Sequence, residues 1–600
     1  MSARTSSLSL WERLYPGVRV AQERERSRSY ATLTRRWRAG LSQRERRFAL
    51  LLVVAASLIY LALVAAQLNR PLMYDDANFA LAARAVADTG LPYGNQGWMS
   101  ERGDFSQREQ WALWHPPLYV YLEGLLARLG GWTPPVLRLP GVVGGLLSAL
   151  LTYLLARRLT RGPPALRHVA GSLAASLFVV CPLVVQSTLI LDIDFPLLLP
   201  LTLLFLWLYL RLEATPRRWL WLTPLFAVLL WAKMTNPLPL IAVVAVWQIL
   251  RGQVLRATLH LVGIGVAGTA LFGASWLLVG RWLGFPLDMP FGVNLVQWQD
   301  SAEVARAAYT SPGAFIEGLQ PTVLWLGPGL AGLGLGGVAI RVARLARCWR
   351  FVGADLLIGL LAVLVLGYVN KYAGWFPKYQ VSLVPLLACL AAPLVAHAWC
   401  TRPRATLLSA VAGLVVGAAI SLGLVRDEWA LQRTWAIQPG AGAWLLAGLV
   451  VAAIAGLPAR AAGAAATAAL VGITLGSSLG LDVYQAGAAY QTDYWYGTTG
   501  TLEAADWVTA HLGPDDTYVA AKEVAIRSRD QRYVDQDNLV YFLNAGRGFD
   551  GTWAGEPVRA LVMWQREPYT ADLFGRVLPA RGFHPTERFG DYVIYVPDAS

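Results

Sequence analysis

Long apolar segments alternate with short polar connections along most of the chain. About thirteen of these segments contain roughly 17–25 mostly apolar residues, the length at which an α-helix crosses the hydrocarbon core of a bilayer. A helix satisfies its own backbone hydrogen bonds in lipid, so each segment is predicted to span the membrane. Their approximate positions are 48–68, 137–157, 169–189, 193–212, 218–234, 236–251, 258–280, 321–341, 353–370, 379–399, 405–424, 441–457 and 462–481. The pattern predicts a polytopic α-helical membrane protein.

Clusters of arginine predict which ends of these helices face the cytoplasm. They occur within residues 1–47 and in the connections RRLTRGPPALR, RLEATPRR, RGQVLR, RVARLARCWR and TRPR. Because Lys and Arg accumulate in cytoplasmic connections, 1–47 is expected to be a basic cytoplasmic tail, which anionic membrane lipids would also attract. Residues 48–482 would then form the transmembrane domain. Its first loop on the outer side, 69–136, is long.

The character of the chain changes near residue 483, where polar and apolar residues become mixed. TLEAADWVTAHLG, at 501–513, has the spacing of an amphipathic helix that ends at Gly513. DDTYVAA, ALVMW and DYVIYV have the composition of short strands. We therefore expect a small extracytoplasmic α/β domain over residues 483–600.

Composition supports this assignment and excludes other classes. Of the 600 residues, 56% are hydrophobic and only 15% are charged, which indicates an integral membrane protein. The net charge of +13 follows from the predicted cytoplasmic arginines, so no nucleic-acid partner is expected. The four cysteines have neither CxxC nor Cys/His spacing, which argues against a disulfide framework and a zinc site. The predicted location is a plasma membrane, of a bacterium, crossed many times.

Two adjacent carboxylates, Asp75 and Asp76, follow the first predicted span in the segment MYDDANFALAARAVADTG. Apolar residues then recur at helical spacing and Gly90 lies where a helix would stop, so a short helix along the membrane surface is predicted over 76–88. Carboxylates at a helix N-terminus can cap free N–H groups and oppose the macrodipole. The same two groups could also take part in catalysis, and local sequence leaves both interpretations open.

Three other motifs are expected on the same side of the membrane. In WHPPLYVYL, His115 could bind phosphate or metal or shuttle a proton, or it could be structural. In TLILDIDFPLLLP, Asp192 and Asp194 could together bind a divalent ion such as Mg²⁺ or Mn²⁺, or they could form an interfacial turn. In WAKMTNPLP, Lys233 could bind an anionic ligand or extend its ammonium group to the interface.

A further segment, NKYAGWFPKYQVSLVP, adds Lys378 and Tyr379 to this outer side. The side therefore collects carboxylates, possible metal ligands and cations that could bind phosphate. No Walker loop, GxSxG or HExxH motif occurs in the chain, so nucleotide hydrolysis, serine hydrolysis and zinc proteolysis have no support.

The order and sidedness of these motifs resemble the GT-C superfamily of membrane glycosyltransferases. The branch most similar contains the protein O-mannosyltransferases and the bacterial aminoarabinose transferase for lipid A. The resemblance lies in YDDANFALAARAVADTG, HPPLY, LDIDFPL, WAKMTNP and PKYQVSLVPLL, and it extends over roughly the first 400 residues. It implies a GT-C type fold and transfer of a sugar from a polyprenyl-phosphate donor to an acceptor, whether lipid, glycan or protein.

The resemblance also implies roles for individual residues. Asp75 matches the main catalytic acid of the family, with Asp76 beside it, and Asp194 matches the acid at the start of the fourth span. The residues expected near the donor phosphate are Lys233, His115, Lys378 and Tyr379. If the enzyme uses a divalent metal, its candidate ligands are Asp75, Asp192, Asp194 and His115. Many relatives have Asp-Glu in the first loop and some have Glu-Lys before the prolines, so metal use stays open.

The predicted chemistry is a single displacement that inverts the anomeric centre. A carboxylate such as Asp75 would take the proton of the acceptor hydroxyl, while cations stabilise the departing phosphate. A lipid-linked glycan flippase or transporter, and a glycan polymerase or ligase, are the alternatives. A transporter predicts ionisable residues deep within the spans, whereas the middle of most predicted spans is apolar. A catalytically inactive scaffold that presents the C-terminal domain is a further alternative.

Overall fold

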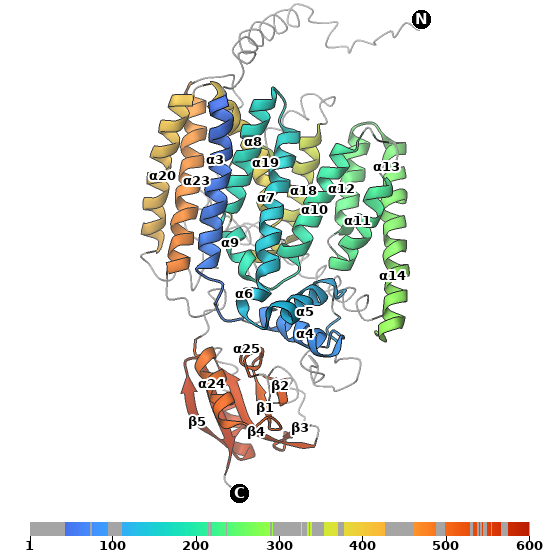
Figure 1. Cartoon of the computed structure of the whole chain (residues 1–600), viewed down its shortest axis with the longest axis vertical. Helices are drawn as coiled ribbons and strands as arrows, with labels where there is room; N and C mark the ends of the chain where they lie inside the picture. Colours follow the sequence, from blue (N-terminus) through green and yellow to red (C-terminus); the bar gives the residue numbers. More distant parts are fainter. Residues whose placement is uncertain are drawn as a thin grey trace, which may run out of the picture.

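The computed structural model describes residues 43–72, 75–93, 111–288, 353–369, 377–425, 461–487 and 499–598, with short stretches left undescribed inside some of these ranges, and a few positions between 291 and 338. Helices stand side by side in a bundle and a sheet domain lies beyond one end of it (Figure 1). The chain is therefore mostly helical, with a separate C-terminal sheet, as the sequence predicts.

Helices occupy the predicted apolar segments wherever those segments are described. They are α3 Gln43–Ala65, α7 Leu139–Leu159, α8 Pro164–Val179, α9 Pro182–Leu189, η2 Asp194–Leu198, α10 Leu199–Arg211, α11 Trp219–Ala232, α12 Pro237–Leu250, α13 Val254–His260, η3 Leu261–Val266, α14 Ala267–Leu283, α18 Ala354–Val369, α19 Leu383–Thr401, α20 Pro403–Val425 and α23 Ala461–Gly487. Most of the predicted spans 321–341 and 441–457 lies outside the described residues.

Length and apolar composition identify only some of these helices as complete spans. Among the described residues, Pro134–Leu159, Asp194–Arg211 and Val254–Leu283 are long and apolar enough to cross a bilayer. The pair α8 and α9 would make a fourth if it counts as one span. Several other helices are apolar but shorter. The number of thirteen spans therefore stays a prediction.

The predicted straight span 169–189 is bent by 57° between α8 and α9. The break falls at Val180 and Cys181, directly before Pro182. Proline has no N–H to donate and its ring clashes with the carbonyl of the preceding turn, so a regular helix cannot continue through this point. The bend leads the chain through α9 to the segment that contains Asp192 and Asp194.

The two ends of the bundle differ in chemistry. Arg251 forms an ion pair with Glu213, so the arginine-rich connections after α10 and α12 meet at one end. Two short helices lie across the opposite end, namely α4 Asp75–Thr89 and α5 Leu118–Gly130 (Figure 1). The helix predicted over 76–88 is therefore present, and it is separated from the arginine-rich connections by the length of the bundle.

Helices α4 and α5 pack closely against each other. A Cβ atom at Gly124 would lie 2.7 Å from a methyl group of Val86 and 2.9 Å from the carbonyl oxygen of Ala83, so only glycine fits there. One turn earlier, the rings of Phe79 and Tyr119 meet edge to face at 5.4 Å. The close approach fixes the two helices as one unit.

The C-terminal domain combines helices with a mixed sheet. Its elements are α24 Thr501–His511, α25 Lys522–Ala525, β1 Thr517–Ala520, β2 Arg532–Asp535, β3 Thr552–Trp553, β4 Glu556–Trp564, β5 Phe583–Phe589 and β6 Tyr592–Pro597. The strand order is β2-β1-β4-β6-β5, parallel among the first three strands and antiparallel afterwards, with β3 beside β4. The predicted helix and three strands are present, whereas β2, β3 and β5 escaped the sequence pattern because they are short or mostly polar.

The sheet domain packs on α4 rather than hanging free of the bundle. Helix α25 contacts α4, and one continuous hydrophobic cluster includes Phe79 of α4, Val524 of α25 and Tyr518 of β1. Arg84 of α4 is buried and close enough for its charge to act on the Tyr518 hydroxyl. The domain is therefore in direct contact with the helix that follows the first span.

Glycine allows α20 and α23 to pack with their backbones almost touching. The two helices carry the matched pairs Gly413/Gly417 and Gly472/Gly476, each with the four-residue spacing of small residues at membrane helix interfaces. A Cβ at Gly417 would lie 2.2 Å from the carbonyl oxygen of Ile473. Without strong hydrophobic attraction between helices in lipid, such close packing is a main source of their association.

We expect Gly417→Ala to destabilise the protein by roughly 1–3 kcal/mol, because the added methyl group has no space against the α23 backbone. Gly273 on α14 has nothing within 4 Å of its Cβ position and provides the control. There, Gly273→Ala should be neutral or stabilising by up to about 1 kcal/mol, because Ala favours helix. Thermal unfolding of the purified protein in detergent measures both effects, and equal shifts would contradict the packing argument.

Candidate active site

The predicted acidic pair lies at the start of α4, and the structure describes the side chain of only the second acid. Asp75 is the first residue of α4, but its side chain lies outside the described part of the chain. The side chain of Asp76 is buried, and its Oδ1 accepts a hydrogen bond of 2.8 Å from the backbone N–H of Leu191. Asp76 therefore links the start of α4 to the turn that carries the second acidic motif.

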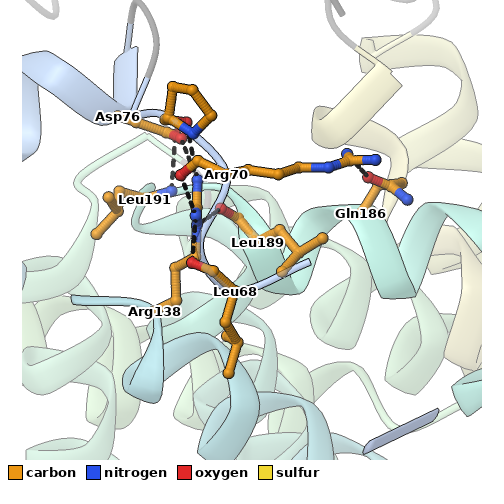
Figure 2. A network of polar contacts seen from close by, with 8 residues as sticks. Leu68, Arg70, Asp76, Arg138, Gln186, Leu189 and Leu191 are labelled. Atoms are coloured by element: carbon orange, nitrogen blue, oxygen red, sulfur yellow. Dashed lines mark hydrogen bonds and ion pairs between the residues drawn. The ribbon is translucent and has the colours of Figure 1, made fainter. Parts of the chain in front are cut away.

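Arg138 holds this region together, as Figure 2 shows. Its Nε donates to the carbonyl oxygen of Leu189 at 2.7 Å, at the end of α9. Its terminal nitrogens donate to the carbonyls of Leu68, Arg70 and Pro71, which follow α3, at 2.7, 2.6 and 3.1 Å. The same guanidinium lies 3.6 Å from Oδ2 of Asp76. One buried arginine thus joins the end of α3, the end of α9 and the start of α4.

Two buried carboxylate–lysine pairs are formed by Asp192 and Asp194, which follow the segment bound by Arg138 and Asp76. Both carboxyl oxygens of Asp194, at the start of η2, accept hydrogen bonds from Nζ of Lys233 at 2.9 and 2.8 Å. Asp192 forms an ion pair of 2.8 Å with Lys378, which belongs to the short helix η4 Pro377–Gln380. Burial makes unpaired charges costly, so each lysine is held in place by its acid.

Tyr379 connects the two pairs. The Nζ atoms of Lys233 and Lys378 lie 5.1 and 5.3 Å from the centre of its ring, within the range of cation–π attraction. His115 is close enough to both lysines and to Asp192 for their charges to act on it. The structure therefore brings together six of the residues singled out from the sequence: His115, Asp192, Asp194, Lys233, Lys378 and Tyr379.

His115 is held uncharged. Burial lowers its pKa to about 3, and the charges of Lys233 and Lys378 lower it further against the opposing effect of Asp192. Its Nδ1 is buried and has no hydrogen-bond partner among the described residues. A neutral imidazole with an unpaired ring nitrogen can donate or accept one hydrogen bond to a ligand, but it does not supply positive charge at neutral pH.

An apolar groove starts at this cluster. Asp194 and Tyr379 lie at its wall, and the rest of the lining is mainly leucine, valine and proline from α10, α12, α18 and α19. A cavity of this kind suits a ligand with a long apolar part and a polar end.

Comparisons with known proteins give a family match for part of the chain and a similar fold for most of it. Residues 114–277 match the family model described as dolichyl-phosphate-mannose-protein mannosyltransferase. The fold is similar to the crystal structure of ArnT from Cupriavidus metallidurans bound to undecaprenyl phosphate, at 16% identity and a TM-score of 0.58, covering 92% of this chain and 98% of that one. The apo structure of the same ArnT gives 17% identity, a TM-score of 0.52 and coverage of 91% and 97%. No curated protein matches the chain at a significant level.

The chain resembles the GT-C membrane glycosyltransferases of the ArnT and protein mannosyltransferase branch. The matched segment 114–277 includes His115, Asp192, Asp194 and Lys233. It therefore covers much of the cluster but not the start of α4 or the helix η4.

The described residues do not fit a divalent metal in this GT-C-like site. No group of three or more His, Cys, Asp or Glu side chains among them could hold an ion. Asp192 and Asp194, two of the four residues expected as ligands, are each neutralised by a lysine at 2.8 Å. A cation entering here would meet two ammonium groups, so we assign no step to a metal.

Sequence reasoning missed three buried polar residues near this end of the bundle. Glu123, Gln380 and Asp482 are each 0% exposed. The side-chain oxygens of Gln380 and Asp482 have no hydrogen-bond partner among the described residues, and the Tyr119 hydroxyl lies close enough to Glu123 to act on its carboxyl group. Arg138 was also missed, although it stands alone before an apolar span in PVLRLPGVV. The signal for all four residues was present, because a polar side chain beside long apolar stretches is costly unless it has a function or a partner.

We expect Arg138→Lys to lower stability by about 2–4 kcal/mol, because a single ammonium group cannot reach the carbonyls and the carboxylate that the planar guanidinium joins. Arg138→Ala should be worse, since it leaves Asp76 buried without its ion pair. The exposed Arg128 on α5 provides the control, where Lys should change stability by under about 0.5 kcal/mol. Thermal unfolding in detergent measures the stability of all three variants. Equal effects of Lys at positions 138 and 128 would contradict the structural role given to Arg138.

His115 should make stability depend on pH. In the unfolded chain its imidazole takes up a proton below about pH 6.5, whereas the folded protein resists protonation down to about pH 3. Stability is therefore lost as the pH falls from about 6.5 towards 3, by up to about 1.4 kcal/mol per pH unit. Melting temperatures of the wild type and His115→Asn between pH 4.5 and 7 should diverge towards acid, with the wild type falling more steeply. Parallel curves would show that folding does not lower the pKa of His115.

Proposed function

We propose that the protein is a glycosyltransferase that moves a hexose or pentose from a polyprenyl-phosphate donor to an acceptor at the extracytoplasmic face of the membrane. The observation that carries this proposal is the apolar groove that ends at Tyr379 and Asp194, beside the two buried lysines. A polyprenyl phosphate has the complementary form, a long apolar chain that ends in an anion. The groove takes the chain and the lysine cluster takes the phosphate.

The comparisons support the class of donor. The family that matches residues 114–277 is described by a dolichyl-phosphate sugar, and the ArnT structure of similar fold is bound to undecaprenyl phosphate. Both compounds are polyprenyl phosphates. The similarity in fold extends over nearly the whole chain, so the groove and the cluster have a framework that suits such a ligand.

Lys233 and Lys378 stabilise the departing phosphate. An ammonium group has three N–H donors, and Lys233 uses two of them on Asp194, which leaves the third for a phosphate oxygen. The carboxylates hold both lysines in place before the donor arrives, so little reorganisation is needed as negative charge develops on the phosphate. Neutral His115 adds a hydrogen bond through its unpaired ring nitrogen.

The reaction is a single displacement. The acceptor hydroxyl loses its proton to Asp75 as its oxygen attacks the anomeric carbon. The bond from that carbon to the phosphate oxygen breaks, and its electron pair leaves with the polyprenyl phosphate. One displacement inverts the anomeric centre. Asp76 supports Asp75 from the next position, because its bonds to Leu191 and Arg138 fix the first turn of α4.

We expect Asp75→Asn to abolish transfer, because an amide cannot take the proton of the acceptor. Asp88→Asn removes the same charge from the exposed end of α4 and should keep activity. Purified protein in membrane vesicles is incubated with a panel of polyprenyl-phosphate sugars, and release of the lipid phosphate is measured. Asn caps a helix as well as Asp, so a merely structural Asp75 predicts near-normal turnover in the variant. Absence of release by the wild type with every donor would favour a flippase or a scaffold.

A further inference from the structure

Glu123 is a buried carboxylic acid that the proposed reaction does not use. It lies on α5 and is 0% exposed, and the Tyr119 hydroxyl, one turn earlier on the same helix, is close enough to act on its carboxyl group. A carboxylate that is fully buried without a cation is costly in its charged form, which favours the neutral acid.

The surroundings of Glu123 lead directly to the start of α4. A Cβ atom at the adjacent Gly124 would collide with Val86 and Ala83 of α4, so Glu123 lies where α4 and α5 approach each other closely. Tyr119, one turn earlier, packs on Phe79 of α4, and the charges of Asp76 and Asp192 reach its hydroxyl. Glu123 is therefore close to the residues that fix the first turn of α4.

The charged and titratable groups facing Glu123 favour its neutral form. Asp76 of α4, a second acid, is close enough for its charge to act on Glu123, and so is the hydroxyl of Tyr119 on the same helix. Helices α6 Pro134–Leu137 and α11, which also pack on α5, contain no ionisable residue. Burial raises the pKa of Glu123 to about 8, the Tyr119 hydroxyl partly offsets this effect, and the charge of Asp76 raises the pKa further.

We propose that Glu123 is a positioning residue that must be uncharged for α5 to hold the start of α4, and with it Asp75, in the arrangement needed for transfer. An ionised Glu123 would put a second negative charge beside Asp76. That charge would oppose the bonds of Asp76 to Leu191 and Arg138, which set the first turn of α4. The consequence for activity rests on the proposed function, whereas the neutral state of Glu123 does not.

Stability tests the protonation state without any substrate. In the unfolded chain Glu123 ionises near pH 4.3, whereas in the folded protein it keeps its proton to about pH 8. The stability due to the neutral acid is complete below about pH 4.3 and is lost as the pH rises to about 8. The melting temperature of the wild type should therefore fall relative to that of Glu123→Gln across this range. Asp88→Asn, on the exposed end of α4, should run parallel to the wild type.

Parallel curves for the wild type and Glu123→Gln would overturn the proposal. If the glutamine variant does not fold, Glu123→Leu, which is also uncharged and of similar size, provides the same comparison. Failure of both uncharged variants to fold would also overturn the proposal, because it requires only that the residue be neutral.

Activity tests the positioning role. Turnover of the wild type should decline above about pH 8, whereas Glu123→Gln should lack this decline, so the ratio of variant to wild-type turnover should rise about tenfold between pH 7 and pH 9. A purely structural role would lower turnover of the variant by the same factor at every pH, and this result would overturn the positioning role. If neither protein releases lipid phosphate but the melting curves diverge as expected, the proposed transferase function fails while the neutral state of Glu123 stands.

Discussion

Arg138 is the residue on which the geometry of this site depends. Its guanidinium donates to four carbonyl oxygens in two chain segments, the residues that follow α3 and the end of α9. A buried carbonyl without a partner costs about as much as a lost hydrogen bond. One arginine side chain here supplies the hydrogen bonds that several buried carbonyls need. The ion pair with Asp76 adds the start of α4 as a third segment and ties it to the end of α9. The acidic motif after the first span and the acidic motif after α9 thereby become neighbours.

The other charges of the site follow the same rule. Asp192 and Asp194 are buried, and each is paired with a lysine from a distant part of the chain. Buried pairs of this kind contribute little net stability, because desolvation consumes most of the attraction. Their benefit is positional, since the ammonium groups of both lysines are held 5.1 and 5.3 Å from the centre of the Tyr379 ring, at the wall of an apolar groove. The arrangement gives a fixed place for an anion attached to a long apolar chain.

The C-terminal domain belongs to the same unit. Its helix α25 contacts α4 and its strands β1 and β6 contribute to the hydrophobic cluster that continues into the bundle. Helix α4 is consequently held from two sides, by α5 and the bundle on one and by the sheet domain on the other (Figure 1). Changes in either neighbour can therefore reach the first turn of α4, where Asp75 lies.

The sequence by itself determined the helical membrane architecture, the arginine-rich end and the motifs that gather at the opposite end. These features are local, since the length of an apolar segment and the charge of a loop are properties of one stretch of sequence. It also indicated four elements of the C-terminal domain through their periodicity. Only the tertiary structure decided which acid meets which base. Asp194 pairs with Lys233 and Asp192 with Lys378, whereas Asp76 turns to Arg138, a residue with no motif around it. The physical reason is that the cost of burying a charge depends on partners brought together by folding, and no local pattern along the chain encodes those partners.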